Sequence, residues 1–263
     1  MNEVPLLTSI DGVVTASGEA LLPMPDDGLL RGDGVFEVLR SYEGTLFALG
    51  DHLERLGRSA AAIGLEIQRD PLEAETAALL ARADGVDCLV RIVVTRGGRR
   101  IIGLEKLLVH TPSISLATVT YSPTVILNGV KSLSYAANME ATRIAKRSGA
   151  AEALLVRPDG IVLEAPTSAL FWVSESGSLK TTSLETGVLD SITRDRIIEH
   201  CDVEVGAFPI RDVMTSSEAF LASTTREVQT VDSIDGEKIP TSPAPRTLEA
   251  AKAFAAVLQA ELP

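Results

Sequence analysis

The spacing of apolar residues in the first third of the chain predicts short strands that alternate with helices. Asp51, with Glu54 three residues later, indicates the start of a helix, because this spacing is typical of a side-chain cap. The residues that follow repeat at helical spacing and predict its buried stripe: Leu53, Leu56, Ala60 and Ile63.

A second helix and a strand complete this part of the pattern. Asp70 followed by Pro71 predicts a helix start, since proline is tolerated in the first turn. The run Cys88–Val94 is rich in β-branched residues and predicts a strand. We expect a small α+β domain over residues 1–110.

The pattern breaks near His110, and a strand-rich section begins at Ile114. We therefore expect a linker at 111–114 and a larger domain over 115–263. Within the larger domain we expect a helix that ends at Gly149, hairpin turns at 158–160 and 174–177, a loop at 240–245 and a long last helix. The expected buried face of the first of these helices is Ala137, Ala141, Ile144 and Ala145.

Composition excludes several classes of function. The formal charge of −12 over 263 residues argues against a nucleic-acid partner, because such partners need clustered Lys and Arg. Two distant cysteines and three histidines show no metal-site or disulfide spacing. Neither a membrane span nor a signal-peptide layout is visible, so we expect no membrane partner and a cytoplasmic protein.

Lys131 stands out among six lysines, because it follows the apolar run 125–127 and precedes a predicted helix near Tyr135. A lysine at the end of a strand can point into a cleft, where burial lowers the amine pKa and prepares it to attack a carbonyl. The residue alone favours a solvated surface lysine, since charged residues are mostly exposed.

Three further segments carry polar groups beside apolar strands. Glu164 lies between two apolar runs, where a carboxylate needs a positive partner. The segment 190–194 predicts a helix start whose backbone amides at Ile192 and Thr193 can bind an anion, although an ordinary cap has the same pattern. Residues 223–225 then present three consecutive hydroxyls after a strand.

Together these segments resemble the class IV aminotransferases, a family of enzymes that use pyridoxal 5'-phosphate (PLP). The family includes branched-chain and D-amino acid aminotransferases, R-selective amine transaminases and aminodeoxychorismate lyases. The resemblance covers nearly the whole chain, and the matching segments follow the family's order: residues 32–37, 51–56, 131–133, 163–165, 191–194 and 222–228.

The resemblance implies a two-domain enzyme of fold type IV, α+β or α/β in class, whose larger domain holds a pseudo-barrel. It implies that Lys131 forms a Schiff base (an aldimine) with PLP and shuttles the substrate proton, and that Glu164 faces the pyridine nitrogen. It also implies a set of other cofactor-binding residues: Arg55 on the phosphate, with Leu189, Ile192, Thr193, Ser223 and Thr224. Arg55 lies off the apolar stripe of its helix, so the sequence equally permits a surface arginine.

The sequence says less about the substrate than about the cofactor, because the chain departs from its relatives at the expected substrate-binding positions. D-amino acid enzymes carry Tyr where this chain has Phe36, and their Arg-x-His motif is missing after Thr95. Branched-chain enzymes have Tyr where this chain has Arg31. We hypothesise that Arg31 binds the substrate carboxylate, against the alternative of a surface arginine. The full set of expected substrate-binding residues is Arg31, Phe36, Arg99, Arg100, Tyr135 and Thr225.

Three functions follow from these residues. The first is a transaminase that moves an amino group between an amino acid, with D-amino acids slightly favoured, and a 2-oxo acid. The second is an aminodeoxychorismate lyase that releases pyruvate, and the third is a non-catalytic PLP-binding relative. No metal is expected, and the resemblance implies a homodimer.

Overall fold

The computed structural model describes residues 3–242 and 244–262, which form two compact units. The first unit takes the described residues up to Leu108, together with Val130–Tyr135 and the end of the chain from Gln259. The second takes Val109–Gly129 and Ala136–Leu258. The domain bounds expected from sequence stay a prediction about folding domains, whereas these units describe packing.

The first unit is built on an antiparallel sheet whose strands have the order β2-β1-β6-β5-β3-β4. Strand β3 completely buries Val35, Glu37 and Leu39, which are alternate residues and so share one face. The bounds are β1 Leu7–Ile10, β2 Val13–Ala16, β3 Gly34–Tyr42, β4 Thr45–Leu46, β5 Leu89–Thr95 and β6 Arg100–Glu105.

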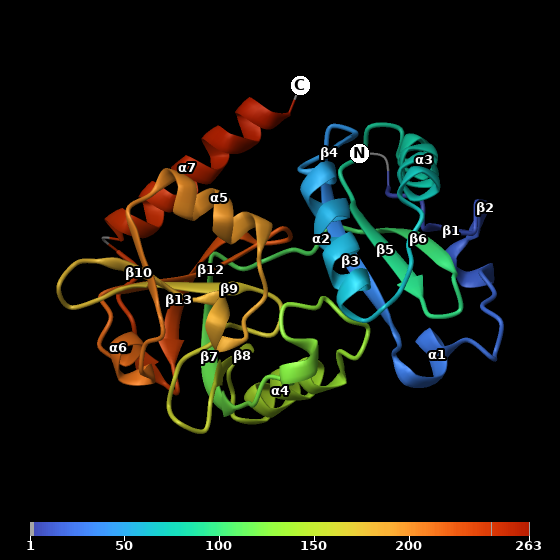
Figure 1. The fold of residues 1–263 in the computed structure, drawn as a ribbon. Helices are drawn as coiled ribbons and strands as arrows, with labels where there is room; N and C mark the ends of the chain where they lie inside the picture. The colour runs from blue at the N-terminus through green and yellow to red at the C-terminus, as the bar shows by residue number, and fades with distance from the viewer. Residues whose placement is uncertain (1–2, 243, 263) are drawn as a thin grey trace. The chain divides into compact units, whose positions relative to one another are not determined.

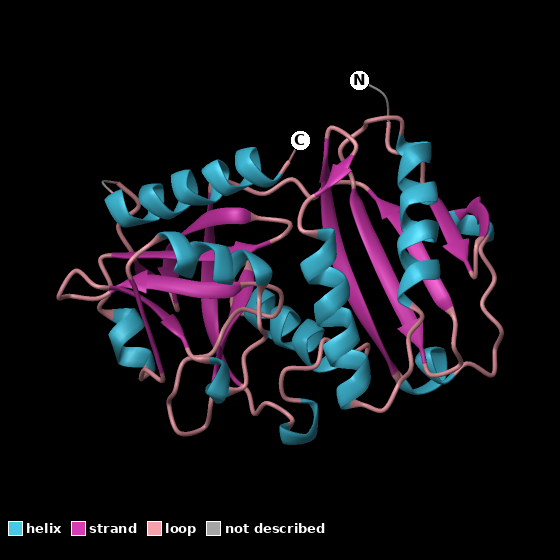
Figure 2. Ribbon diagram, turned by 45° about the horizontal axis from the view of Figure 1, so that its top comes forward, coloured by secondary structure: helices cyan, strands magenta, loops and turns pink. Residues whose placement is uncertain are grey.

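Helices α2 and α3 pack on this sheet and share its apolar core (Figure 2). The predicted stripe of α2 is confirmed, with Ile63 partly buried and the other three residues buried. The unit's helices are α1 Asp27–Arg31, α2 Leu49–Ala62 and α3 Arg69–Leu80, with 3-10 turns η1 Ser17–Glu19 and η2 Ala81–Ala83.

The predicted starts of helices α2 and α3 are wrong by three and two residues. Helix α2 begins at Leu49 after Ala48, which has φ of 52°, so Asp51 lies inside the first turn and does not cap it. Helix α3 begins at Arg69, which puts Asp70 and Pro71 in its first turn. A proline is accommodated there because the first amides of a helix have no intrahelical acceptor.

The second unit holds a curved sheet of order β11-β10-β9-β12-β13-β7-β8, with β14 paired to β13 (Figure 1). Strands β8, β9 and β12 are buried at every residue, because apolar clusters cover both faces. The presence of this half-barrel and of a separate sheet in the first unit confirms the predicted fold class. Its strands are β7 Ser113–Thr120, β8 Glu152–Val156, β9 Ala169–Val173, β10 Leu179–Thr182, β11 Val203–Gly206, β12 Glu218–Ser223, β13 Glu227–Ile234 and β14 Glu237–Lys238.

The predicted helices of the second unit form at the expected positions, but one of them buries a narrower face than expected. Both predicted hairpin turns form, and the long last helix is present. Ala137 and Ile144 of α4 are exposed, however, because the helix buries a narrow stripe centred on Ala141 and Ala145. The bounds are η3 Val125–Leu127, α4 Ala136–Arg147, η4 Leu184–Thr186, α5 Ile192–His200, α6 Ile210–Met214 and α7 Pro245–Glu261.

The run 125–127 before Lys131 is not a strand. It forms the 3-10 turn η3, in which Val125 and Ile126 are 88% and 84% exposed. The run lies between Pro123 and Gly129, whose φ is 74°, and its Leu127 amide donates to Thr124 O at 2.9 Å, as in a tight turn. The placement of Lys131 therefore has another cause, given below.

Candidate active site

Lys131 is held by the first unit through its backbone. Its carbonyl accepts a hydrogen bond from the Phe36 amide at 3.0 Å, and its own amide donates to Ser59 Oγ at 3.1 Å. Leu133 N donates to Gly34 O at 2.9 Å, so the segment lies along β3 like a short extra strand. The lysine is therefore fixed to a sheet, which is a rigid support for a reactive amine.

The Lys131 amine lies over an aromatic pair. Its Nζ is 4.7 Å from the centre of the Phe36 ring, and Tyr135 packs edge to face on the same ring at 5.3 Å. An aromatic face attracts a cation and offers no hydrogen-bonding group that competes for the amine. Two of the expected substrate-binding residues, Phe36 and Tyr135, thus lie beside the expected catalytic lysine.

Arg55 is buried on the sheet side of α2, where it meets a carboxylate. Its Nε and Nη2 donate to the two oxygens of Glu37 at 2.7 and 2.6 Å, and His52 Nδ1 lies 2.8 Å from the same carboxylate. Burial acts to raise the pKa of Glu37, but the hydrogen bonds from Arg55 and His52 outweigh it and lower this pKa to about 2. The carboxylate is charged, and Arg55 is no surface arginine.

His52 is neutral in this cluster. Burial lowers its pKa more than the attraction of Glu37 raises it. Its Nε2 has no hydrogen-bond partner among the described residues, which agrees with a ring that carries its proton on Nδ1 and donates it to Glu37. The cluster therefore holds one positive and one negative charge, locked together under β3.

Glu37 and His52 were not predicted as site residues. The sequence did carry a signal for them. His52 and Arg55 are three residues apart on one face of α2, next to its apolar stripe, and Glu37 faces the same core from β3. Polar groups at core positions need partners, so the pattern indicates that these residues are paired without specifying which residue pairs with which.

The arginines expected at the substrate carboxylate all have carboxylate partners in the first unit. Arg31, whose side chain is 69% exposed, pairs with Asp27 one turn before it. Arg99 Nη1 lies 2.7 Å from Asp11, and Arg100 Nη2 lies 2.7 Å from Glu75. Their role toward a substrate stays a prediction.

Glu164 and Leu189 lie together in the second unit. Leu189 N donates to Glu164 Oε1 at 2.9 Å, which orients the carboxylate from outside its own strand segment. Tyr121 is close enough that burial, and then the charge of Glu164, raise its phenol pKa. Tyr121 was not predicted, since no local pattern links it to a residue 43 positions later.

Helix α5 begins where the sequence predicts an anion site. Ser191 is its cap and accepts a hydrogen bond from Arg194 N, while Ile192 and Thr193 are buried in the first turn. Such a turn presents amides and the positive end of the helix dipole. Burial, and then a hydrogen bond with Asp190, raise the pKa of Asp195 in this turn to about 6.

The three hydroxyls after β12 form a tight turn. Ser223 is buried, Thr224 and Thr225 are half-buried, and Ser223 Oγ lies 3.4 Å from Thr225 Oγ1. Arg226 N closes the turn on Ser223 O at 3.2 Å.

This donor set fits PLP chemically. The expected site residues include an amine, a buried arginine, a carboxylate, and amides with hydroxyls, which are the groups that an aldehyde, a pyridine nitrogen and a phosphate would need as partners. Among residues 3–242 and 244–262 we find no group of three side chains suited to a metal ion, and no helix long and apolar enough to cross a membrane.

Comparison with known proteins agrees with this chemistry. The amino-transferase class IV family matches residues 34–234, about three quarters of the chain. The chain is 32% identical over 256 residues to a Methanocaldococcus jannaschii protein assigned as a branched-chain-amino-acid aminotransferase, covering 88% of each. It is 31% identical over 268 residues to the D-alanine aminotransferase of Bacillus licheniformis, covering 90% of this chain and 92% of that one.

Solved structures of other aminotransferases have the same fold. A structure of a hypothetical aminotransferase from Mycobacterium tuberculosis, in PLP-bound form, superposes with a TM-score of 0.86 at 23% identity, covering 95% of this chain and 99% of that one. The fold is that of the fold type IV transaminases. The chain belongs to the class IV aminotransferase family, as the sequence predicted, and PLP is its cofactor.

Proposed function

We propose that this aminotransferase moves an amino group between an amino acid, with D-amino acids slightly favoured, and a 2-oxo acid, and that Lys131 forms the Schiff base with PLP. The observation that carries the proposal is the support of Lys131. Its segment is built into the edge of β3, and its amine lies on the Phe36 ring. A lysine on the surface has no need of such a support.

PLP supplies an electron sink for the pair released when the substrate's α proton leaves. With PLP bound, Lys131 Nζ would be the group that accepts and returns that proton. Glu164 would face the pyridine nitrogen and favour its protonated form, and the Leu189 amide holds this carboxylate in place. The turn of α5 and the hydroxyls of Ser223 and Thr224 would hold the phosphate.

In this scheme Arg55 is a charged side chain that is already paired with Glu37. Because Glu37 occupies its Nε and Nη2, we propose that Arg55 attracts the phosphate as part of the Glu37 cluster, with its orientation fixed before the cofactor arrives.

The preference for D-amino acids is supported by the B. licheniformis relative, a D-alanine aminotransferase, whereas the M. jannaschii relative is assigned to branched-chain amino acids. Arg31 is the residue we propose for the substrate carboxylate, since its exposed helical ion pair with Asp27 is weak enough to exchange for a substrate. Arg31→Ala should then raise KM for amino acids much more than for a simple amine.

The test is an absorption spectrum of the purified enzyme, recorded before and after D- or L-amino acids are added without a 2-oxo acid. Loss of the visible PLP band with D-amino acids supports the proposal, and loss with L-amino acids alone overturns the preference. A band that resists every amino acid favours the lyase, which needs no amino acceptor.

The lysine is tested separately by borohydride reduction and peptide mass mapping. We expect the reduced PLP adduct on Lys131, and none in Lys131→Ala. Lys106→Ala changes an exposed lysine and should leave the adduct in place. An adduct on any lysine other than Lys131 would overturn the assignment.

We also propose a cytoplasmic homodimer. The support is a group of exposed apolar side chains in the first unit, a surface that a monomer would leave in water: Leu21, Met24, Leu29 and Leu30, which are 51–86% exposed. Light scattering of the holoenzyme gives its mass directly, and the mass of a single 27.8 kDa chain would refute the dimer.

A further inference from the structure

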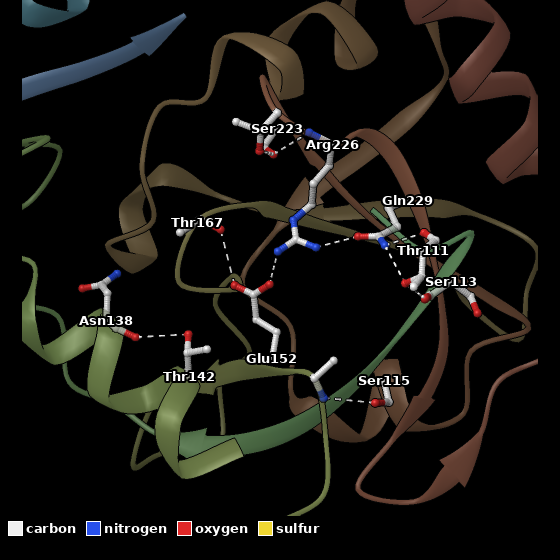
Figure 3. Close-up of polar contacts among 12 residues, drawn as sticks. Thr111, Ser113, Ser115, Asn138, Thr142, Glu152, Thr167, Ser223, Arg226 and Gln229 are labelled. Atoms are coloured by element: carbon white, nitrogen blue, oxygen red, sulfur yellow. Dashed lines mark hydrogen bonds and ion pairs between the residues drawn. The ribbon is translucent and has the colours of Figure 1, made fainter. Parts of the chain in front are cut away.

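A buried ion pair lies behind the Ser223–Thr225 turn in the second unit. Arg226 pairs with Glu152, the first residue of β8, and these side chains are only 9% and 6% exposed (Figure 3). Arg226 Nη1 also donates to Gln229 Oε1 at 2.5 Å. Both arms of the guanidinium thus have partners.

Arg226 supports the turn both through its backbone amide and through its side chain. The Arg226 backbone amide donates to Ser223 O and, at 3.4 Å, to Ser223 Oγ, so it closes the turn. The next residue, Glu227, has φ of 57°, a conformation that L side chains rarely adopt. A strained turn persists only where surrounding contacts determine it, and the Arg226 side chain makes such a contact with β8.

Glu152 connects this turn to a second segment. Its Oε1 accepts a hydrogen bond from Thr167 Oγ1 at 3.3 Å, three residues beyond Glu164. Gln229 Nε2 donates to Thr111 O at 2.7 Å, at the start of the unit (Figure 3). One buried carboxylate therefore braces the segment after Glu164 and, through Arg226, the turn of three hydroxyls.

We propose that Arg226, anchored by Glu152, is a positioning residue that holds Ser223, Thr224 and Thr225 in the geometry that binds PLP phosphate and substrate. The inference rests on the proposed function of those three hydroxyl residues. A pair that served stability alone would not need to lie on the turn itself, since buried ion pairs are poor stabilisers compared with apolar side chains.

The test uses two conservative variants. Glu152→Gln keeps the shape and removes the charge, and Arg226→Lys keeps the charge and loses the planar fork. We expect each to release PLP from the holoenzyme at least 10-fold faster, followed by the visible band after dilution into a PLP trap. With PLP in excess, KM for the amino acid should rise more than kcat falls.

A matched control separates positioning from loss of stability. Lys180→Met breaks the ion pair of Lys180 with Asp212, 3.0 Å apart, in the same unit but away from the turn on β10 and α6. It should lower Tm without changing PLP release. In a double variant, Glu152→Gln and Arg226→Lys should act less than additively, because each breaks the same pair.

PLP release at the wild-type rate in Glu152→Gln would overturn the inference, whether or not Arg226→Lys folds. Equal release from the Lys180 control at equal loss of Tm would also overturn it. A failure of the proposed transaminase function would give a different result from these. The wild-type enzyme would then bind PLP on Lys131 but transfer no amino group.

Discussion

The Glu37 carboxylate, buried between Arg55 and His52, allows a quantitative prediction. Glu37→Gln keeps the size of the side chain and removes its charge. Arg55 then remains buried with a neutral acceptor, and its second hydrogen bond faces an amide that can only donate. We expect a large loss of stability in the first unit.

The magnitude follows from the pKa of Glu37. It falls from an ordinary value of 4.5 to about 2 in the folded chain. Each pKa unit corresponds to about 1.4 kcal/mol, so the charged form contributes roughly 3 kcal/mol. Breaking a buried ion pair by removing one partner costs about 3–5 kcal/mol, which is the same range.

The pH window has a definite sign. The folded pKa of Glu37 is lowered, so its contribution is fully present above pH 4.5 and is lost as the pH falls from 4.5 toward 2. The wild-type protein should lose stability through this window, and Glu37→Gln should lose less.

The assay is hydrogen exchange of peptides from α2, because the one tryptophan, Trp172, reports on the other unit. A loss of about 3 kcal/mol corresponds to roughly 100-fold faster exchange. Glu140→Gln, which removes an exposed carboxylate paired with Arg143, is the control and should leave α2 unchanged. Exchange within threefold of the wild type at pH 7 would refute the reasoning.

Three other perturbations have expected outcomes. The pKa of Asp195 is raised to about 6, so negative charge appears at the α5 anion site as the pH rises through 6; PLP titrations should weaken there, and less so in Asp195→Asn. Glu218→Gln weakens the cap of α7, where the carboxylate accepts from Thr247 N at 2.8 Å, and should cost about 1 kcal/mol in denaturation followed by Trp172 fluorescence. Gly34→Ala puts a methyl group 2.5 Å from a carbonyl oxygen of β5 and should lower Tm strongly, whereas Gly18→Ala meets nothing within 4 Å and should not.

Periodic features were predictable from sequence because they depend on local spacing. The stripe of α2, the strand β5 and the hairpin turns follow from repeats of 3.6 and 2 residues and from glycine at positive φ. The start of α2 was not predictable, because Ala48 adopts a left-handed conformation that its type does not favour. The exposed turn at 125–127 was misread because composition alone cannot separate a short buried strand from an apolar turn.

The candidate site also has a part that was predictable from sequence and a part that was not. The family motifs predict Lys131, Glu164 and the α5 turn as site residues, and local capping explains the turn without any relative. The partners of these residues come from distant parts of the chain. Glu152 meets Arg226 across 74 residues, and Glu37 meets Arg55 across 18. Such pairs depend on strand register, which a single sequence does not specify.

The route of residues 130–135 into the first sheet has a consequence for fragments of this protein. A piece that ends at Leu108 would contain every named strand of that sheet and yet leave the edge of β3 at Val35 and Phe36 without its hydrogen-bonding partner. Open strand edges promote aggregation. Expression of the N-terminal region alone should therefore give insoluble material, and a synthetic peptide of residues 128–136 added during refolding should recover soluble protein.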